Sequence, residues 1–183
     1  MRGTIPESSK SRPLLALSLM LLLNGCAAGW GIPVGRFQPM DPPLKTIALA
    51  PNGGIFADLI GIELSEQGYA IVDTGATLAL LVFMQRTQDD LLSPEIMAVF
   101  KGHGIDAVLL VQKVDGTDGL PQTVHIRLYS ATSLAEVGGV EWGNSWIRRG
   151  VLESAQEIAA AMSKGLSGEE RRGSSDSEPE ILL

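Results

Sequence analysis

The stretch that decides the fold is Ala107-Val108-Leu109-Leu110-Val111-Gln112-Lys113-Val114. Its first five residues are apolar at every position, which is typical of a central strand covered on both faces. A turn over Asp115–Pro121 follows it. The next segment, Thr123–Tyr129, then alternates, with Val124, Ile126 and Leu128 on one face and His125, Arg127 and Tyr129 on the other. Because a short turn joins neighbouring antiparallel strands, these two segments predict the middle of a sheet.

Toward the amino terminus, short apolar runs alternate with segments of helical spacing. We expect a strand at Lys45–Ala50, a glycine loop at Pro51–Gly54, a helix at Phe56–Gln67 and a strand at Tyr69–Val72. A helix over Ala76–Arg86 is apolar nearly all round, which predicts that it is buried. A further helix begins at Ser93-Pro94-Glu95, a hydroxyl cap followed by proline and an acid, and runs to Lys101.

Toward the carboxyl terminus, Glu136–Trp146 reads as a third consecutive strand, with a β-bulge expected at Gly138-Gly139. Val151–Leu166 is an amphipathic helix. The predicted order is therefore β-α-β-α-α-β-β-β-α. Strands joined by crossover helices give way to an antiparallel meander, which predicts an α/β (α+β) fold with a mixed sheet in two or three layers.

The only cysteine, Cys26, lies at the end of a secretory signal. Arg2, Lys10 and Arg12 precede an apolar block, Leu14–Leu23, which is shorter than the roughly 20 residues that span a bilayer. This pattern predicts that residues 1–25 are a signal peptide that is removed. A plain secreted protein with a chance cysteine is the alternative interpretation.

Leu23-Asn24-Gly25-Cys26 resembles the lipobox of bacterial lipoproteins, although the family usually has Ala, Ser or Thr where this chain has Asn24. The resemblance implies cleavage before Cys26 and acylation of its thiol with palmitate-type chains. Several chains on one cysteine suffice for stable membrane attachment. Ala27 at the next position looks like the signal for the outer membrane, and the domain would then face the periplasm.

Composition limits the remaining choices. The chain has 183 residues and a formal charge of −7, so it lacks the basic surface that nucleic acid requires. Residues 26–43, rich in proline and glycine, read as a lipidated tether. Residues 44–166 are long enough for one globular domain, and residues 167–183 read as a disordered acidic tail. With Cys26 acylated, no disulfide forms within the chain.

Three segments of the domain resemble a known family. They are Lys45-Thr46-Ile47-Ala48-Leu49-Ala50-Pro51, Gly68-Tyr69-Ala70-Ile71-Val72-Asp73 and Gly104-Ile105-Asp106-Ala107-Val108-Leu109-Leu110-Val111. These stretches are similar to parts of the CsgG-like lipoproteins and of the amino-terminal domain of TolB. The turns at Asp115–Pro121 and Ser130–Glu136 leave no room for membrane hairpins. The chain therefore looks like the minimal members, such as the Pel polysaccharide export lipoproteins and the lipoprotein activators of penicillin-binding proteins, which are non-catalytic.

No pattern of residues predicts catalysis, a metal or a cofactor. His103 and His125 lack partner ligands at metal-binding spacing. Asp89-Asp90 offers too few oxygen ligands for a cation, and Pro51–Gly54 lacks the spacing and lysine of a phosphate loop. The serines have no nucleophile-elbow frame. We therefore expect that the protein is not an enzyme.

Trp142 and Trp146 share one face of the last predicted strand, and Arg148 follows them. Tryptophan beside arginine is enriched at interfaces, so these three residues are a candidate contact surface. The alternative is that the tryptophans pack in the core under the Val151–Leu166 helix.

Taken together, the sequence predicts an outer-membrane lipoprotein that is an accessory or assembly component of envelope export or secretion. Its expected partners are the membrane, proteins of the cell envelope and further copies of itself. Two alternatives stay open. One is an activator of a cell-wall synthase, and the other is a small-ligand-binding module that uses the Gly53-Gly54 loop at the carboxyl ends of the parallel strands.

Overall fold

The computed structural model describes residues 34–38, 40–115, 120–144 and 149–167. Its sheet has six strands in the order β1-β6-β5-β4-β2-β3. The strands are β1 (Val34–Phe37), β2 (Thr46–Leu49), β3 (Ala70–Val72), β4 (Ala107–Asp115), β5 (Pro121–Ser130) and β6 (Glu136–Gly143). The helices are α2 (Gly54–Glu66), α3 (Thr74–Phe83), α4 (Pro94–Gly102) and α5 (Val151–Ser167). The fold is mixed α/β, as the sequence predicts.

The sheet has a parallel half and an antiparallel half that meet at β4. β2 pairs in parallel with β3 and with β4, so that Ile47 lies between Ile71 and Ala107. β4, β5, β6 and β1 then pair antiparallel in turn. Crossover helices connect the parallel strands and tight connections join the antiparallel ones, which is the division that the sequence pattern indicates.

Side-chain hydrogen bonds fix where α3 and β2 begin. The Asp73 carboxylate accepts a hydrogen bond from the Ala76 backbone N–H at 2.7 Å and caps α3. The Asp106 carboxylate accepts hydrogen bonds from the backbone N–H groups of Lys45 and Thr46 at 2.8 and 2.9 Å, which ties the start of β2 to the loop before β4. The Gly104–Asp106 segment therefore has a structural role.

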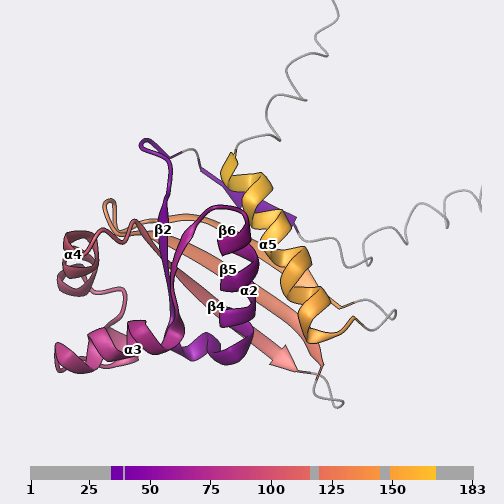
Figure 1. Ribbon diagram of the computed structural model, residues 1–183, viewed down its shortest axis with the longest axis horizontal. Helices are drawn as coiled ribbons and strands as arrows, with labels where there is room; N and C mark the ends of the chain where they lie inside the picture. The colour runs from indigo at the N-terminus through magenta and orange to yellow at the C-terminus, as the bar shows by residue number, and fades with distance from the viewer. Residues whose placement is uncertain (1–33, 39, 116–119, 145–148, 168–183) are drawn as a thin grey trace, which may run out of the picture. The chain divides into compact units, whose positions relative to one another are not determined.

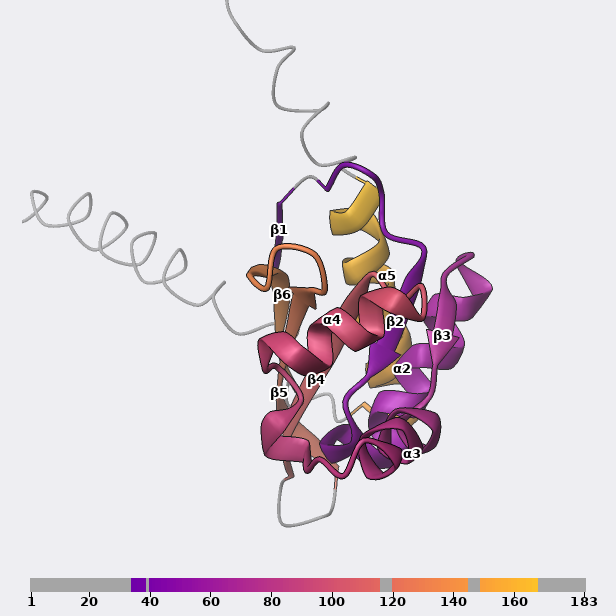
Figure 2. The same ribbon diagram turned by 90° about the vertical axis from the view of Figure 1, so that its left-hand side faces the viewer.

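The two faces of the sheet are covered unequally. On one face, α2 and α5 bury a core that extends across the sheet from Leu49 to Leu109, Ile126 and Trp142 (Figure 1). On the other face, α4 and the buried side of α3 cover only the parallel half, around Val108 and Phe100 (Figure 2). Among the described residues, no helix packs on that second face over β5, β6 and β1. The domain thus has three layers at one end and two at the other.

The structure differs from four of the expectations. Val34–Phe37 lies inside the segment expected to be a tether, yet it pairs with Glu141–Gly138 as an edge strand. Helix α3 is only partly buried, because Thr77 and Leu81 are enclosed and Leu80 is half-buried while Leu78, Val82 and Phe83 face outward. β6 ends at Gly143, and its register shift lies between Glu136 and Gly138, just before the glycine pair.

Candidate functional site

Trp142 lies in the core, which is one of the two alternatives left open by the sequence. Its side chain is 2% exposed, on the face covered by α5. The indole Nε1 donates a hydrogen bond to Glu157 Oε2 at 3.0 Å, and the Arg149 guanidinium also donates to that oxygen. Trp142 therefore joins β6 to α5 and offers no exposed surface to a partner.

The other predicted site residues lie outside the described residues. Cys26, Trp146 and Arg148 fall in segments whose structure is not described, as do the signal peptide and the acidic tail after Ser167. Their roles stay predictions from the sequence.

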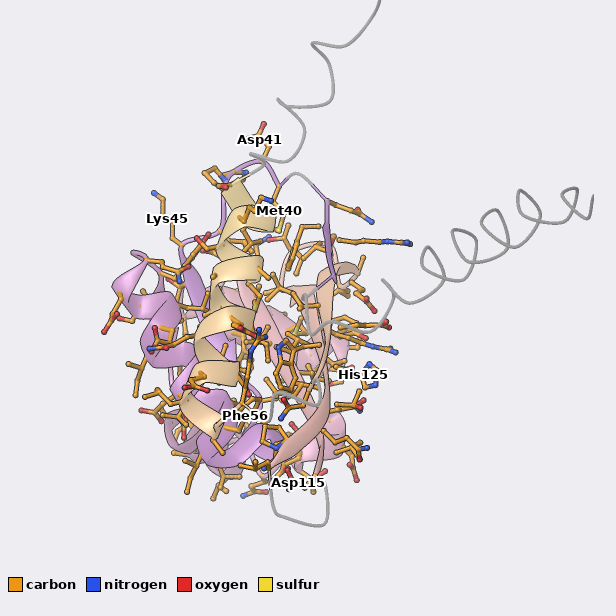
Figure 3. The ribbon with its side chains drawn as sticks, turned by 90° about the vertical axis from the view of Figure 1, so that its right-hand side faces the viewer. Met40, Asp41, Lys45, Phe56, Asp115 and His125 are labelled. Atoms are coloured by element: carbon orange, nitrogen blue, oxygen red, sulfur yellow. The ribbon has the colours of Figure 1, made fainter. Side chains whose placement is uncertain are left out.

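The uncovered face of β5, β6 and β1 carries a cluster of charged side chains. The strand register places Gly139 between Arg36 of β1 and Arg127 of β5, in one row across the three strands. Glu141 lies two residues after Gly139 on β6 and pairs with His125 of β5. Glu136 precedes Gly139 on the same strand and pairs with Tyr129. Because side chains two residues apart share a face, all of these groups project from the same side. Figure 3 shows His125 on the side of the sheet away from α5.

These residues surround a hollow of about 410 Å³ with Gly139 at its floor. Its lining residues are Arg36, His125, Ile126, Arg127, Glu136, Gly139, Val140 and Glu141. The floor is bare because a side chain does not fit there: a Cβ on Gly139 would lie 2.5 Å from the carbonyl oxygen of Ile126. We call this feature the Gly139 hollow.

Charge contacts inside the Gly139 hollow are loose. Arg127 Nη1 lies 3.9 Å from Glu136 Oε2, and His125 Nδ1 lies 3.9 Å from Glu141 Oε1. The Tyr129 hydroxyl donates to Glu136 Oε2 at 3.3 Å. The interaction with Tyr129, followed by the nearby carboxylates, raises the pKa of Arg127 above its usual value. Within the described residues Arg36 makes no ion pair, so its charge is available to a ligand.

A second candidate surface is the outward side of α3. Leu78, Val82 and Phe83 are 40%, 64% and 86% exposed. No charged residue occurs between Asp73 and Arg86. We call these three side chains the α3 apolar surface. Contiguous exposed apolar side chains on a folded domain commonly mark a protein or membrane contact.

The remaining candidates have structural surroundings. Asp90 accepts hydrogen bonds from the Thr87 backbone and hydroxyl, both at 3.0 Å, in a capping box. His103 follows the last turn of α4 and is exposed. Gly53 abuts Ala57 and Val111, so the Pro51–Gly54 loop is packed against α2 and β4. In the described ranges, no group of three His, Cys, Asp or Glu residues is placed to hold a metal ion.

None of the helices in the described segments has the length and hydropathy needed to cross a bilayer.

No protein-family model matches the chain, and no curated protein matches it. The similar solved structures are distant. A variant of the PelC dodecamer from Paraburkholderia phytofirmans has a TM-score of 0.47 and 16% identity, covering 73% of this chain and 96% of that chain. A second PelC dodecamer structure from the same organism has a TM-score of 0.45 and 15% identity, over 74% and 96%. The lipoprotein GNA1162 from Neisseria meningitidis has a TM-score of 0.41 and 17% identity, over 73% and 99%.

Sequence reasoning missed both surfaces. Proline and glycine on either side of Arg36 favour a tether and conceal a short strand. The apolar residues of α3 favour a buried helix, because the sequence does not reveal how few neighbours cover it. The alternation of His125, Arg127 and Tyr129 did indicate an exposed face on β5.

Proposed function

We propose that the protein is a non-catalytic lipoprotein of the outer membrane and acts as an accessory or assembly component of an envelope export or secretion system. The lipobox-like Leu23–Cys26 supports attachment to the membrane. The observation that carries the accessory role is the α3 apolar surface. A lipid-anchored domain that leaves this surface uncovered is suited to docking on another protein.

The proposed occupant of the α3 apolar surface is a second copy of the chain. Copies of an acidic protein repel each other through their charged surfaces. Contact through Leu78, Val82 and Phe83 avoids this repulsion, since the segment between Asp73 and Arg86 is uncharged. Removing these side chains from water is favourable by about 25 cal/mol for each Å² of apolar area. Homo-oligomers formed in this way would constitute the assembly unit.

Light scattering tests the assembly. The chain from Ala27 to Leu183 retains every described residue, and we expect it to form a species larger than one chain. Phe83→Ser should shift it toward the monomer while leaving its unfolding free energy nearly unchanged, because Phe83 is 86% exposed. Leu152→Ser is the matched control, since Leu152 is an exposed apolar residue on α5. A strict monomer at high concentration would count against the proposal.

Mass spectrometry of the protein purified from membranes tests the anchor. The expected amino terminus is an acylated Cys26, and Cys26→Ser should abolish acylation and release the protein from the outer-membrane fraction. An unmodified terminus elsewhere contradicts the lipoprotein assignment.

Photo-crosslinking in cells from position 83 tests the role. Adducts with a second copy, together with adducts to an outer-membrane export component, support the proposal. Adducts with a penicillin-binding synthase alone would favour the activator alternative and overturn the export role.

A further inference from the structure

We propose that the Gly139 hollow binds the zwitterionic headgroup of an ethanolamine phospholipid, with the phosphate between Arg36 and Arg127 and the ammonium group at Glu141 or Glu136. The inference rests on the proposed membrane anchoring and names a lipid that the anchored domain would recognise.

The arginines can converge on one group. Adjacent strands lie about 4.8 Å apart, so the Cα atoms of Arg36 and Arg127 lie roughly 10 Å apart across Gly139. Their long side chains reach a common point above the bare floor. Guanidinium groups present planar forks of N–H donors that match phosphate oxygens. The absent side chain at Gly139 lets a headgroup approach the backbone closely.

The carboxylates distinguish a zwitterion from a simple anion. Glu141 lies two residues along β6 from Gly139, about 7 Å away, and Glu136 lies at a similar step in the other direction. An isolated phosphate would be repelled by both carboxylates. A phosphate that carries an ammonium group on a two-carbon linker satisfies the arginines and a glutamate together. Lipid phosphates without an ammonium group meet only half of the site.

The ion pairs already present in the Gly139 hollow are weak enough for a headgroup to replace them. The Arg127 and Glu136 side chains are 58% and 45% exposed, and their nearest charged atoms are 3.9 Å apart. Exposed pairs of this kind contribute about 0–1 kcal/mol. A headgroup that replaces them with shorter charge-assisted hydrogen bonds therefore gains more than it displaces.

Chain length places the hollow near the bilayer. Val34 pairs with Glu141 at the hollow, and Cys26 precedes Val34 by eight residues. Eight extended residues span at most about 28 Å. An acyl anchor on Cys26 would hold this face within that distance of the lipid surface. Since the chain is acidic, anionic lipids are disfavoured relative to zwitterionic ones.

Vesicle co-sedimentation of the chain from Ala27 to Leu183 tests the proposal without the anchor. The vesicles contain phosphatidylcholine alone, phosphatidylcholine with phosphatidylethanolamine, or phosphatidylcholine with phosphatidylglycerol. We expect about tenfold stronger binding to the ethanolamine vesicles, because only that headgroup combines a phosphate with ammonium N–H donors. Soluble glycerophosphoethanolamine should compete for the bound protein.

Variants assign the two halves of the site. Arg36→Gln and Arg127→Gln should each weaken binding to ethanolamine vesicles, and Glu141→Gln with Glu136→Gln should remove the preference for ethanolamine over glycerol headgroups. Lys101→Gln is the control, because it removes one exposed positive charge from α4, on another part of the domain. All five residues are exposed, and circular dichroism checks that each variant is folded.

Equal binding to all three vesicles, or loss of binding with Lys101→Gln to the same degree, overturns the proposal. Tighter binding to glycerol headgroups or to inorganic phosphate, unaffected by the glutamate variants, identifies a simple anion site instead. An unacylated Cys26 combined with a retained ethanolamine preference would remove the anchoring proposal and leave this one standing. An acylated Cys26 combined with no ethanolamine preference would keep the anchoring proposal and overturn this one.

Discussion

Thr77 lies on the sheltered side of α3 with none of its surface exposed, and its hydroxyl has no hydrogen-bond partner within the described part of the chain. A buried hydroxyl without a partner destabilises the folded state by about 1–3 kcal/mol. Thr74, one turn earlier, differs because its hydroxyl donates to the Asp58 carboxylate at 2.8 Å. The two threonines of α3 therefore allow a direct comparison of a buried hydroxyl without a hydrogen-bond partner and a hydroxyl with one.

Thr77→Val should raise the unfolding free energy by about 1 kcal/mol, because valine has the same shape and no polar group to satisfy. Thr74→Val should lower it by a similar amount, since the Asp58 carboxylate loses the hydroxyl donor and keeps the Thr74 backbone N–H. Urea denaturation of both variants measures the difference. A Thr77→Val protein that is less stable than the parent would show that the hydroxyl has a partner after all.

The environment of Asp90 predicts that the stability of the fold depends on pH. Hydrogen bonds from the Thr87 backbone and hydroxyl lower the pKa of this carboxyl below its ordinary value of 3.8. Because this pKa is lower in the folded than in the unfolded state, the ionised carboxylate stabilises the folded state at pH values above the unfolded-state pKa. That contribution is lost as the pH falls through the folded pKa. Asp90→Asn should therefore be less stable than the parent at neutral pH and equal to it in strong acid, as urea titrations at several pH values would measure. A constant gap across that range would contradict the assignment.

Among the elements, β1 is held by an aromatic ring between two glycines. A Cβ on Gly138 of β6 would lie 2.2 Å from the Phe37 ring, and one on Gly165 of α5 would lie 2.1 Å from it. Phe37 thus fills a space that the strand and the helix both leave open. Gly138, which the sequence suggested as part of a bulge, thus allows this close packing.

Gly138→Ala should destabilise the domain by about 1–3 kcal/mol, because the added methyl group also meets the Arg36 carbonyl oxygen at 2.7 Å, and backbone cannot move aside cheaply. Gly143→Ala, in the same strand with open space around it, should change stability little. Thermal unfolding of the two variants compares them directly. Equal melting temperatures would mean that β1 is not held in this way.

For the whole molecule, the amino-terminal strand decides where the sheet ends. β1 covers the hydrogen-bonding edge of β6 and supplies Arg36 to the Gly139 hollow. Without β1, the β6 edge would be open to pairing with another chain. The segment that begins at Val34 is therefore part of the folded domain.

A chain that begins at Met40 should unfold at lower urea concentration than one that begins at Val34 and should aggregate more readily. The reason is that β6 becomes an exposed edge and the Phe37 contacts are lost. Hydrogen exchange of the β6 amides provides the second measurement, since those that pair with β1 should lose protection. Unchanged protection in the shorter chain would contradict the pairing.

The sequence predicted the helices and strands well where periodicity was strong. The alternation in Thr123–Tyr129 and the capping residues Asp73 and Ser93 act within a few residues, so local pattern reveals them. Two failures had a common cause. The exposure of Phe83 and the pairing of Val34–Phe37 both depend on segments distant in the chain, which local pattern does not encode.

By itself the sequence determined the order of the elements from β2 to α5 and the mixed α/β class, because both depend on neighbouring residues. The signal that leads to Cys26 stays a prediction. Tertiary structure alone decided that Trp142 is enclosed, that α3 is uncovered and that Arg36 and Arg127 flank Gly139. Those outcomes depend on which distant surfaces meet. Helices α2 and α5 cover one face of the sheet, whereas α3 and α4 cover the other face only over its parallel half.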